Sequence, residues 1–187
     1  MKTLFLLAGL LVHGVAFAQT AEKKTVDLSY SYAELRFVDV DFRGGNGLRF
    51  NGSYDLNNNW LIVGGLTSLG FDNNVDTLDL QLGAGYVWNY SEDFDLVSSL
   101  RLVWAEVDSG GTDTDETGFA LSAGTRGLLA PQFEIRGFIH HINLDNRDTY
   151  LELAGDYYFT KQFSAGLSLE FAGDFDVITL GARWFFK

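Results

Sequence analysis

The chain has 187 residues with no cysteine, one proline and 21 glycines, and 15% of it is aromatic. Its formal net charge is −12 at pH 7. The lack of cysteine excludes disulfides and thiolate metal sites. The acidic balance argues against nucleic acid as a partner, because binding phosphates requires clustered Lys and Arg. The length suits a single domain.

The first 18 residues have the pattern of a secretory signal peptide. Met1-Lys2 is a short cationic start, residues 4–12 are apolar but too few to span a bilayer as a helix, and residues 16–18 have the small-x-small pattern of a signal-peptidase site. We predict cleavage after Ala18, which leaves residues 19–187 as the mature domain. An N-terminal membrane anchor is the alternative.

After residue 18, apolar residues recur at every second position, which predicts β-strands rather than helices. The clearest strand alternates from Leu78 to Tyr90. Ten such strands can be placed, paired as five hairpins, the first opening at Val26 and the last ending at Phe186. An even count returns both chain ends to one side, as bacterial outer-membrane barrels require. If residues 37–46 were extended loop, the barrel would have eight strands.

The predicted connections alternate in length and chemistry. Short turns fall at residues 56–59, 91–94, 130–132 and 160–162. Longer acidic connections fall at residues 36–46, 68–76, 107–116 and 143–149, and a briefer one at residues 173–176. Short periplasmic turns and longer external loops are typical of outer-membrane barrels. Aromatic residues gather where strands meet the short turns, as in a girdle at the membrane–water boundary: Tyr54, Trp60, Trp88, Tyr90, Phe94, Phe133, Tyr157, Phe159, Phe163, Trp184 and Phe186.

A soluble barrel or sandwich can show the same alternation with its faces inverted. Here one face carries large apolar residues and the other is rich in Gly, Ser and charge, whereas a closed soluble core needs bulk inside. We therefore predict an all-β fold, a closed antiparallel transmembrane β-barrel.

The last strand places Ile178, Leu180, Ala182, Trp184 and Phe186 on one face. Thr179, Gly181, Trp184 and Phe186 match the polar-x-Gly-x-x-aromatic-x-aromatic signal that ends outer-membrane barrels, although Lys187 follows the aromatic residue. With this tail, the chain resembles small bacterial outer-membrane β-barrel proteins, porin-like and of the OmpA and OmpX type. The resemblance implies an outer-membrane location in a Gram-negative cell. It also implies contact with lipid and lipopolysaccharide and recognition of the tail by the barrel-assembly machinery.

If the apolar face points to lipid, the opposite face lines the lumen with charge. Those charges are Asp27, Arg49, Asp55, Asp79, Arg101, Arg126, Glu134, Arg136, Glu152, Asp156, Glu170 and Arg183. Buried charges must pair or remain hydrated. We predict that Arg136 faces Glu152 or Asp156 and that Glu170 faces Arg183. The network would either plug the lumen or border a narrow hydrated path.

The densest acidic segment, residues 108–116, is expected to be external. Hard divalent cations take oxygen ligands of this kind, but the spacing is not that of an EF-hand. A solvated loop is the simpler interpretation, and weak calcium or magnesium binding is the alternative.

His140 and His141 are the best catalytic candidates. Successive strand residues point to opposite faces, so the two cannot share one metal. No serine is close to them in sequence, although Glu152 or Asp148 could orient a histidine across the hairpin. We therefore predict no catalytic, cofactor or metal site, and no enzymatic activity.

Three functions fit these features. The leading hypothesis is a monomeric structural or surface-interaction barrel whose lumen is largely filled by salt bridges. The second is a narrow, weakly cation-selective channel for ions or small solutes, because lumen and mouths carry excess negative charge. An outer-membrane enzyme that acts on lipid is a distant third.

Overall fold

The computed structural model describes residues 27–40, 44–72, 74–145, 147–173 and 175–186. The predicted signal peptide, its cleavage after Ala18 and the terminal Lys187 lie outside these residues. All the regular elements in the described part are strands. No helix there is long and apolar enough to cross a membrane.

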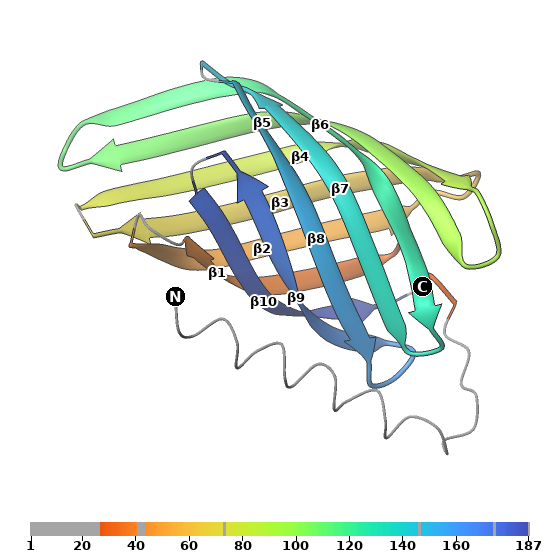
Figure 1. The fold of residues 1–187 in the computed structure, drawn as a ribbon. Coiled ribbons are helices and arrows are strands. Elements are labelled where there is room, and N and C mark those ends of the chain that lie inside the picture. The colour runs from red at the N-terminus through yellow and green to blue at the C-terminus, as the bar shows by residue number, and fades with distance from the viewer. Residues whose placement is uncertain (1–26, 41–43, 73, 146, 174, 187) are drawn as a thin grey trace.

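Ten antiparallel strands close into a barrel (Figure 1), which confirms the predicted fold class and strand count. The strands are β1 (Tyr32–Val40), β2 (Gly45–Asp55), β3 (Trp60–Phe71), β4 (Val75–Asn89), β5 (Phe94–Ser109), β6 (Asp113–Ala130), β7 (Phe133–Asn143), β8 (Arg147–Tyr158), β9 (Phe163–Ala172) and β10 (Phe175–Phe185). Each strand pairs with its neighbours in the chain. The closing pair, β1 with β10, runs from Tyr32 opposite Phe185 to Val40 opposite Val177. Closure leaves no unpaired strand edge.

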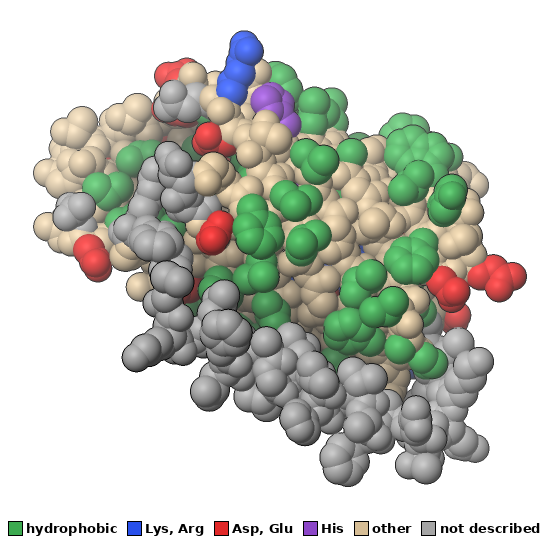
Figure 2. All heavy atoms as spheres, viewed as in Figure 1, with side chains coloured by type: hydrophobic (Ala, Val, Ile, Leu, Met, Phe, Trp, Pro, Cys, Tyr) green, Lys and Arg blue, Asp and Glu red, His purple; other side chains and the backbone are tan. Residues whose placement is uncertain are grey.

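Side chains alternate between the lumen and the outer wall along the strands, apart from an irregularity between Leu128 and Ala130 at the end of β6. On β10, Thr179 and Arg183 are buried inside, whereas Leu180 and Trp184 are 65% and 59% exposed outside. Figure 2 shows hydrophobic side chains spread over the middle of the visible wall, with Asp and Glu side chains toward its ends. An apolar exterior around a polar interior is the pattern of a barrel whose solvent is lipid.

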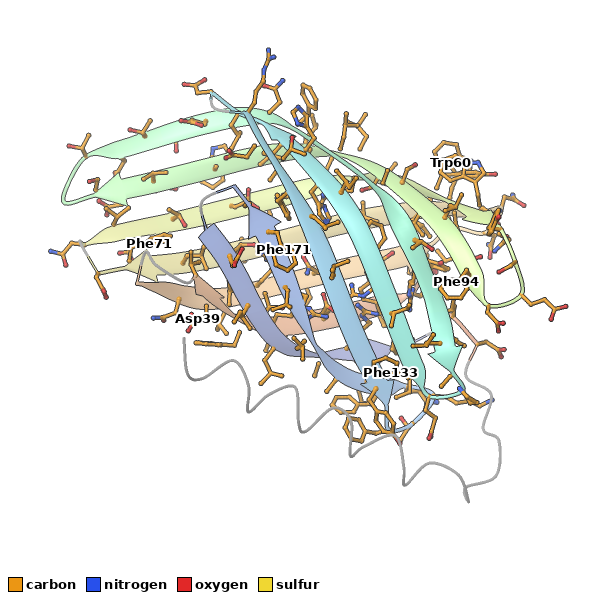
Figure 3. The ribbon with its side chains drawn as sticks, viewed as in Figure 1. Asp39, Trp60, Phe71, Phe94, Phe133 and Phe171 are labelled. Carbon is orange, nitrogen blue, oxygen red and sulfur yellow. The ribbon has the colours of Figure 1, made fainter. Side chains whose placement is uncertain are left out.

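The two ends of the barrel differ in composition. We call the end that holds the start of β1 and the finish of β10 the terminus end, and the other the far end. Trp60, Phe94 and Phe133 lie at the terminus end, whereas Asp39 and Phe71 lie at the far end (Figure 3). Aromatic contacts cluster at the terminus end, such as Trp60 against Tyr86 at 5.1 Å between ring centroids. This grouping matches the aromatic girdle predicted where the strands meet the short turns.

One terminus-end turn shows how sequence sets the hairpins. Asn57, Asn58 and Asn59 all have positive φ, at 74°, 54° and 69°. Asparagine tolerates this left-handed region better than most residues. The Asp55 carboxylate accepts a hydrogen bond from the Asn57 amide at 2.8 Å, which fixes the start of the turn.

The first strand differs from its prediction. We expected it to span Val26 to Tyr32, but β1 begins at Tyr32 and continues through Val40, into the expected loop at residues 36–46. The charged Glu34 and Arg36 interrupted the apolar pattern because they face the lumen, while Leu35 and Phe37 keep the outer face apolar. The eight-stranded alternative is therefore wrong.

The far-end connections are also shorter than their predicted ranges. β5 and β6 pair as far as Asp108 opposite Asp113, so that residues 110–112 alone form the turn between them. The other acidic connections shorten in the same way at residues 72–74 and 144–146. Much of the acidic sequence therefore lies on paired strand ends rather than in loops.

Candidate functional site: the lumen of the barrel

An ion-paired cluster occupies the lumen along β1, β6, β7, β8 and β10. Its arginines and carboxylates are equal in number: Arg36, Arg126, Arg136 and Arg183 with Glu34, Glu134, Glu152 and Asp156. We call these eight residues the charged cluster. Arg183 is its centre, since its Nη2 lies 2.8 Å from Glu34 and its Nη1 lies 3.2 Å from Glu134. Arg183 is only 1% exposed. Burial without pairing would be costly, so each guanidinium needs these carboxylates.

Arg136 joins the cluster to the rest of the lumen. Its guanidinium lies 3.0 Å from Asp156 and 3.7 Å from Glu152. Both partners predicted for Arg136 are therefore present, at unequal distances.

Aromatic rings and Arg126 pack at the terminus end of the lumen. Arg126 donates to Glu134 at 2.8 Å and to the backbone carbonyl of Ser29 at 2.7 Å. The Tyr158 hydroxyl also donates to Glu134. Tyr30 lies before β1 and donates to Asp95 at 2.8 Å; burial raises the pKa of its hydroxyl above the usual value. Tyr30 therefore stays protonated and holds the chain start across the barrel end.

The pairing predicted between Glu170 and Arg183 is wrong. Glu170 pairs with Arg49 of β2, and Arg183 pairs with Glu34 and Glu134. Across the last hairpin Glu170 lies opposite Val177, whereas Arg183 lies opposite Ser164, several rungs away. Register within the hairpin therefore keeps the two apart.

A hydrogen-bonded row crosses β5 to β8 near the middle of the barrel. Arg101 Nη2 lies 2.5 Å from Ser122 Oγ, Ser122 Oγ lies 2.7 Å from His140 Nδ1, and His140 Nε2 lies 3.1 Å from Glu152 Oε2. His141 instead points away from the lumen and contacts Thr149 Oγ1 at 2.8 Å. The two histidines face opposite sides as predicted, and Glu152 is the residue that orients His140.

The other predicted lumen residues lie apart from the charged cluster. Asp27 precedes β1 and its side chain is exposed, so it does not line the lumen wall. Asp55 ends β2 at the terminus-end turn. Asp79 of β4 faces inward and accepts a hydrogen bond from Gln81 at 2.8 Å, with no arginine within ion-pair distance among the described residues.

Sequence reasoning missed Glu34, Arg36 and Ser122. Glu34 and Arg36 alternate with the apolar Leu35 and Phe37, so the period-2 pattern was present although charge obscured it. Ser122 lies directly opposite His140 in the β6–β7 pair. Counting rungs from the predicted turn at residues 130–132 would have brought these two residues together.

A cavity of about 380 Å³ remains beside the charged cluster. Residues from all ten strands line it, and the part of the lining that β2 to β5 contribute includes small residues such as Ser53, Gly65 and Ser99. Its lining includes Tyr30 and Leu61 at the terminus end and Leu69 and Val177 at the far end. Ser53 Oγ, Gln81 Oε1 and Arg101 Nε are buried in this lining without a protein partner. Such polar atoms need water or a ligand.

The four residues of the predicted assembly signal divide between the two faces of β10. Trp184 and Phe186 are exposed on the outer wall. Thr179 is fully buried and contacts Ser168 and Arg36 at 2.7 and 3.0 Å. A Cβ at Gly181 would lie 2.4 Å from Arg36 Cγ, so glycine there makes room for the arginine. Among the described residues, no group of three or more acidic or histidine side chains could hold a metal ion.

Comparisons with known proteins agree with this architecture. The family model described as outer membrane protein beta-barrel domain matches residues 3–171. The structure is similar to KdgM porin, with 10% identity, a TM-score of 0.51, and coverage of 83% of this chain and 99% of that one. It is similar to NanC porin at 12% identity, with a TM-score of 0.50 and coverage of 84% and 96%. No curated protein matches the chain. These likenesses support the fold.

Proposed function

The chain belongs to the outer membrane protein β-barrel domain family, and from this premise we propose that it forms a narrow hydrated passage for ions and small solutes. The cavity in the lumen carries the proposal, because its lining reaches from Tyr30 and Leu61 at one end to Leu69 and Val177 at the other. KdgM and NanC, which share the fold, are porins. KdgM has also been seen with oligogalacturonate, so this architecture can admit a hydrophilic solute.

The chemistry of the cavity wall favours water inside it. Four buried polar atoms of its lining, on Ser53, Gln81, Arg101 and Arg136, have no hydrogen-bond partner among the described residues. An apolar cavity stays dry, whereas unsatisfied polar atoms are usually hydrated. Ten strands also enclose a wider interior than eight, in which side chains just fill the space.

A structural or surface-interaction barrel with a filled lumen is the second candidate. The charged cluster favours it, since Arg183, Glu134 and Asp156 are almost wholly buried and leave no room for a solute between them. In this alternative the cavity would be a closed pocket beside a plug.

The orientation and surroundings follow from the same proposal. The terminus end faces the periplasm, and the acidic strand ends, such as Asp108 and Asp113, face outward among lipopolysaccharide. Their charge attracts cations to the mouth, which makes the passage mildly cation-selective and could hold calcium or magnesium weakly. Signal-peptide removal after Ala18 and recognition of the β10 tail by the barrel-assembly machinery precede insertion of a monomer.

The Ser122–His140–Glu152 row contains the residue types of a hydrolytic triad, but we propose that its role is structural, to hold β6, β7 and β8 in register inside the lumen. Ser122 is buried and Arg101 already donates to its Oγ. A nucleophile must instead be free to approach a substrate. Release of p-nitrophenol from short esters, lost on Ser122→Ala, would contradict this role.

Planar-bilayer recording of refolded protein tests the passage. We expect small, stable conductance steps, larger in Arg136→Ala because its guanidinium lies between cluster and cavity. Arg147→Ala, at the exposed start of β8, is the control and should conduct like the unmodified protein. Circular dichroism and the heat-dependent gel shift of a folded barrel verify each variant. A folded barrel that never conducts, with or without Arg136, rules out the passage and leaves the plug.

A further inference from the structure

The arginines that line the lumen are not equivalent. Of the arginines that the structure describes, six face inward, and five of these have a carboxylate oxygen within 4.0 Å: Arg36, Arg49, Arg126, Arg136 and Arg183. No carboxylate of the described residues comes that close to Arg101. Arg101 is thus a lumenal guanidinium that the protein itself leaves without a counter-charge.

Arg101 is nevertheless held in one place. It lies on β5 opposite Gly83 of β4 and Ala120 of β6, two small residues that leave its side chain space. Its Nη2 donates to Ser122 Oγ at 2.5 Å. Its Nε is buried and has no acceptor, and the residue lines the cavity. A neutral hydroxyl orients the guanidinium but does not neutralise it.

The hydrogen-bonded row explains why Glu152 does not form an ion pair with Arg101. In the imidazole tautomer that leaves Nδ1 without a proton, Ser122 Oγ accepts from Arg101 and donates its own proton to His140 Nδ1, 2.7 Å away. His140 then carries its proton on Nε2 and donates to Glu152 at 3.1 Å. Glu152 is also 3.7 Å from Arg136. The nearest carboxylate along the row is therefore already engaged.

The remaining lumenal carboxylate nearby is Asp79 on β4. It lies opposite Ala105, one inward position beyond Gln81 toward the far end, and takes a hydrogen bond from Gln81 instead of pairing with Arg101. Asp79 lowers the positive potential around Arg101 without occupying its donors.

We propose that Arg101, oriented by Ser122, is a subsite for the carboxylate of a small solute inside the lumen. A guanidinium presents a planar fork of N–H donors that matches a carboxylate in a bidentate manner. The buried Nε supplies a donor that no protein atom uses. A cavity of about 380 Å³ is within the range of small-ligand sites. The acidic mouth determines which ions enter most often, whereas Arg101 determines which solute binds inside the lumen.

This inference rests on the proposed function for its access route, but its test does not need conduction. Protein labelled with ¹⁵N at arginine Nε and refolded in detergent micelles is titrated with glucuronate, and separately with glucose, the same ring without the carboxylate. We expect one Nε signal to shift and saturate with glucuronate and none to shift with glucose. The signal that shifts should be missing from the spectrum of Arg101→Lys, which identifies it. This variant keeps the charge but loses the fork, and calorimetric titration with glucuronate should show roughly tenfold weaker binding than to the unmodified protein. Arg147→Lys, with its exposed guanidinium, is the matched control and should bind like the unmodified protein.

The outcomes separate the subsite from the passage. Equal shifts with glucose, or no saturable shift with glucuronate, overturn the subsite, and this comparison needs only the unmodified protein should Arg101→Lys fail to fold. Unchanged affinity in folded Arg101→Lys also overturns it. Saturable binding in a barrel that never conducts would sustain the subsite and contradict the passage. Conductance without glucuronate binding would sustain the passage and contradict the subsite.

Discussion

The two halves of the barrel wall look alike from outside and differ inside. The strands β1, β6, β7, β8 and β10 direct the charged cluster inward, whereas the inward residues of β2 to β5 include many small ones, such as Ser53, Gly65 and Ser99. One side of the lumen therefore carries bulky ion pairs and the other carries smaller side chains, and residues of both sides line the cavity that remains between them. Closure of a barrel fixes the width of the lumen, but side-chain size decides how much of that width stays open.

The outer faces show no such asymmetry. Leu153 on β8 and Leu82 on β4 are both exposed, at 47% and 63%, where lipid would cover them. Contact with lipid requires only an apolar surface, so the outer faces of the two halves do not differ. The distinction between them is thus a property of the lumen alone, and substitutions there can break it.

The largest expected effect comes from removing the centre of the charged half. Arg183→Met removes the ion pairs of this guanidinium with Glu34 and Glu134. It also removes the stacking of the guanidinium over the Tyr32 ring, at 4.5 Å. Breaking a buried pair by deleting one partner costs about 3–5 kcal/mol. We expect the free energy of unfolding, measured by urea titration in lipid vesicles, to fall by that amount.

Arg147→Met is the control for this substitution, because Arg147 is exposed at the far end of β8. An exposed site of this kind should change stability by about 0.5 kcal/mol or less. If the free energy of unfolding falls little in both variants, the charged cluster does not stabilise the barrel. The two sides of the lumen would then not differ in their contribution to stability.

Narrowing the small-residue half should act on conduction instead. Val63 faces the cavity and Ile62, its neighbour on β3, is 44% exposed on the outer wall. Val63→Phe places a ring in the cavity, so single-channel conductance should fall to roughly half or less while stability changes little. Ile62→Phe adds a ring of the same kind on the lipid side and should leave conductance unchanged. Equal conductance in both variants would mean that ions do not follow β2 to β5.

The facing of the strands could be predicted from the sequence because it depends on local alternation. The last strand set the phase correctly, with Trp184 outside and Arg183 inside. β1 was misplaced because the charged Glu34 and Arg36 made its alternation of inward and outward residues hard to recognise. Once the β1–β10 closure is known, Glu34 lies directly opposite Arg183, and that pair follows from register.

Contacts across the lumen could not be predicted in this way. Arg49 and Glu170 meet although they come from β2 and β9, which are not neighbours in the sheet. Such pairs depend on the tilt and stagger of the closed barrel, which no single hairpin encodes. The cavity was unforeseen for the same reason, since it arises from how the inward side chains of all ten strands combine in space. Its presence is why the passage, second among the hypotheses from sequence, becomes the leading one.

The smallest expected effect tests whether the small-residue half also sets selectivity. Asp79 lines the cavity without an arginine within ion-pair distance among the described residues, and Asp79→Asn removes its charge while keeping an oxygen for Gln81. Unit charges a few ångströms apart interact by about 1 kcal/mol in water, and salt screens this further. The cation-to-anion permeability ratio, from reversal potentials in a salt gradient, should therefore fall roughly twofold.

Asp113→Asn is the matched change at the exposed start of β6, among the acidic strand ends. Its charge faces bulk solvent, where screening is strongest, so its effect on the ratio should be smaller than that of Asp79→Asn. The opposite ranking would assign selectivity to the mouth. The two halves would then differ only in how they fill the lumen, and not in what they let through.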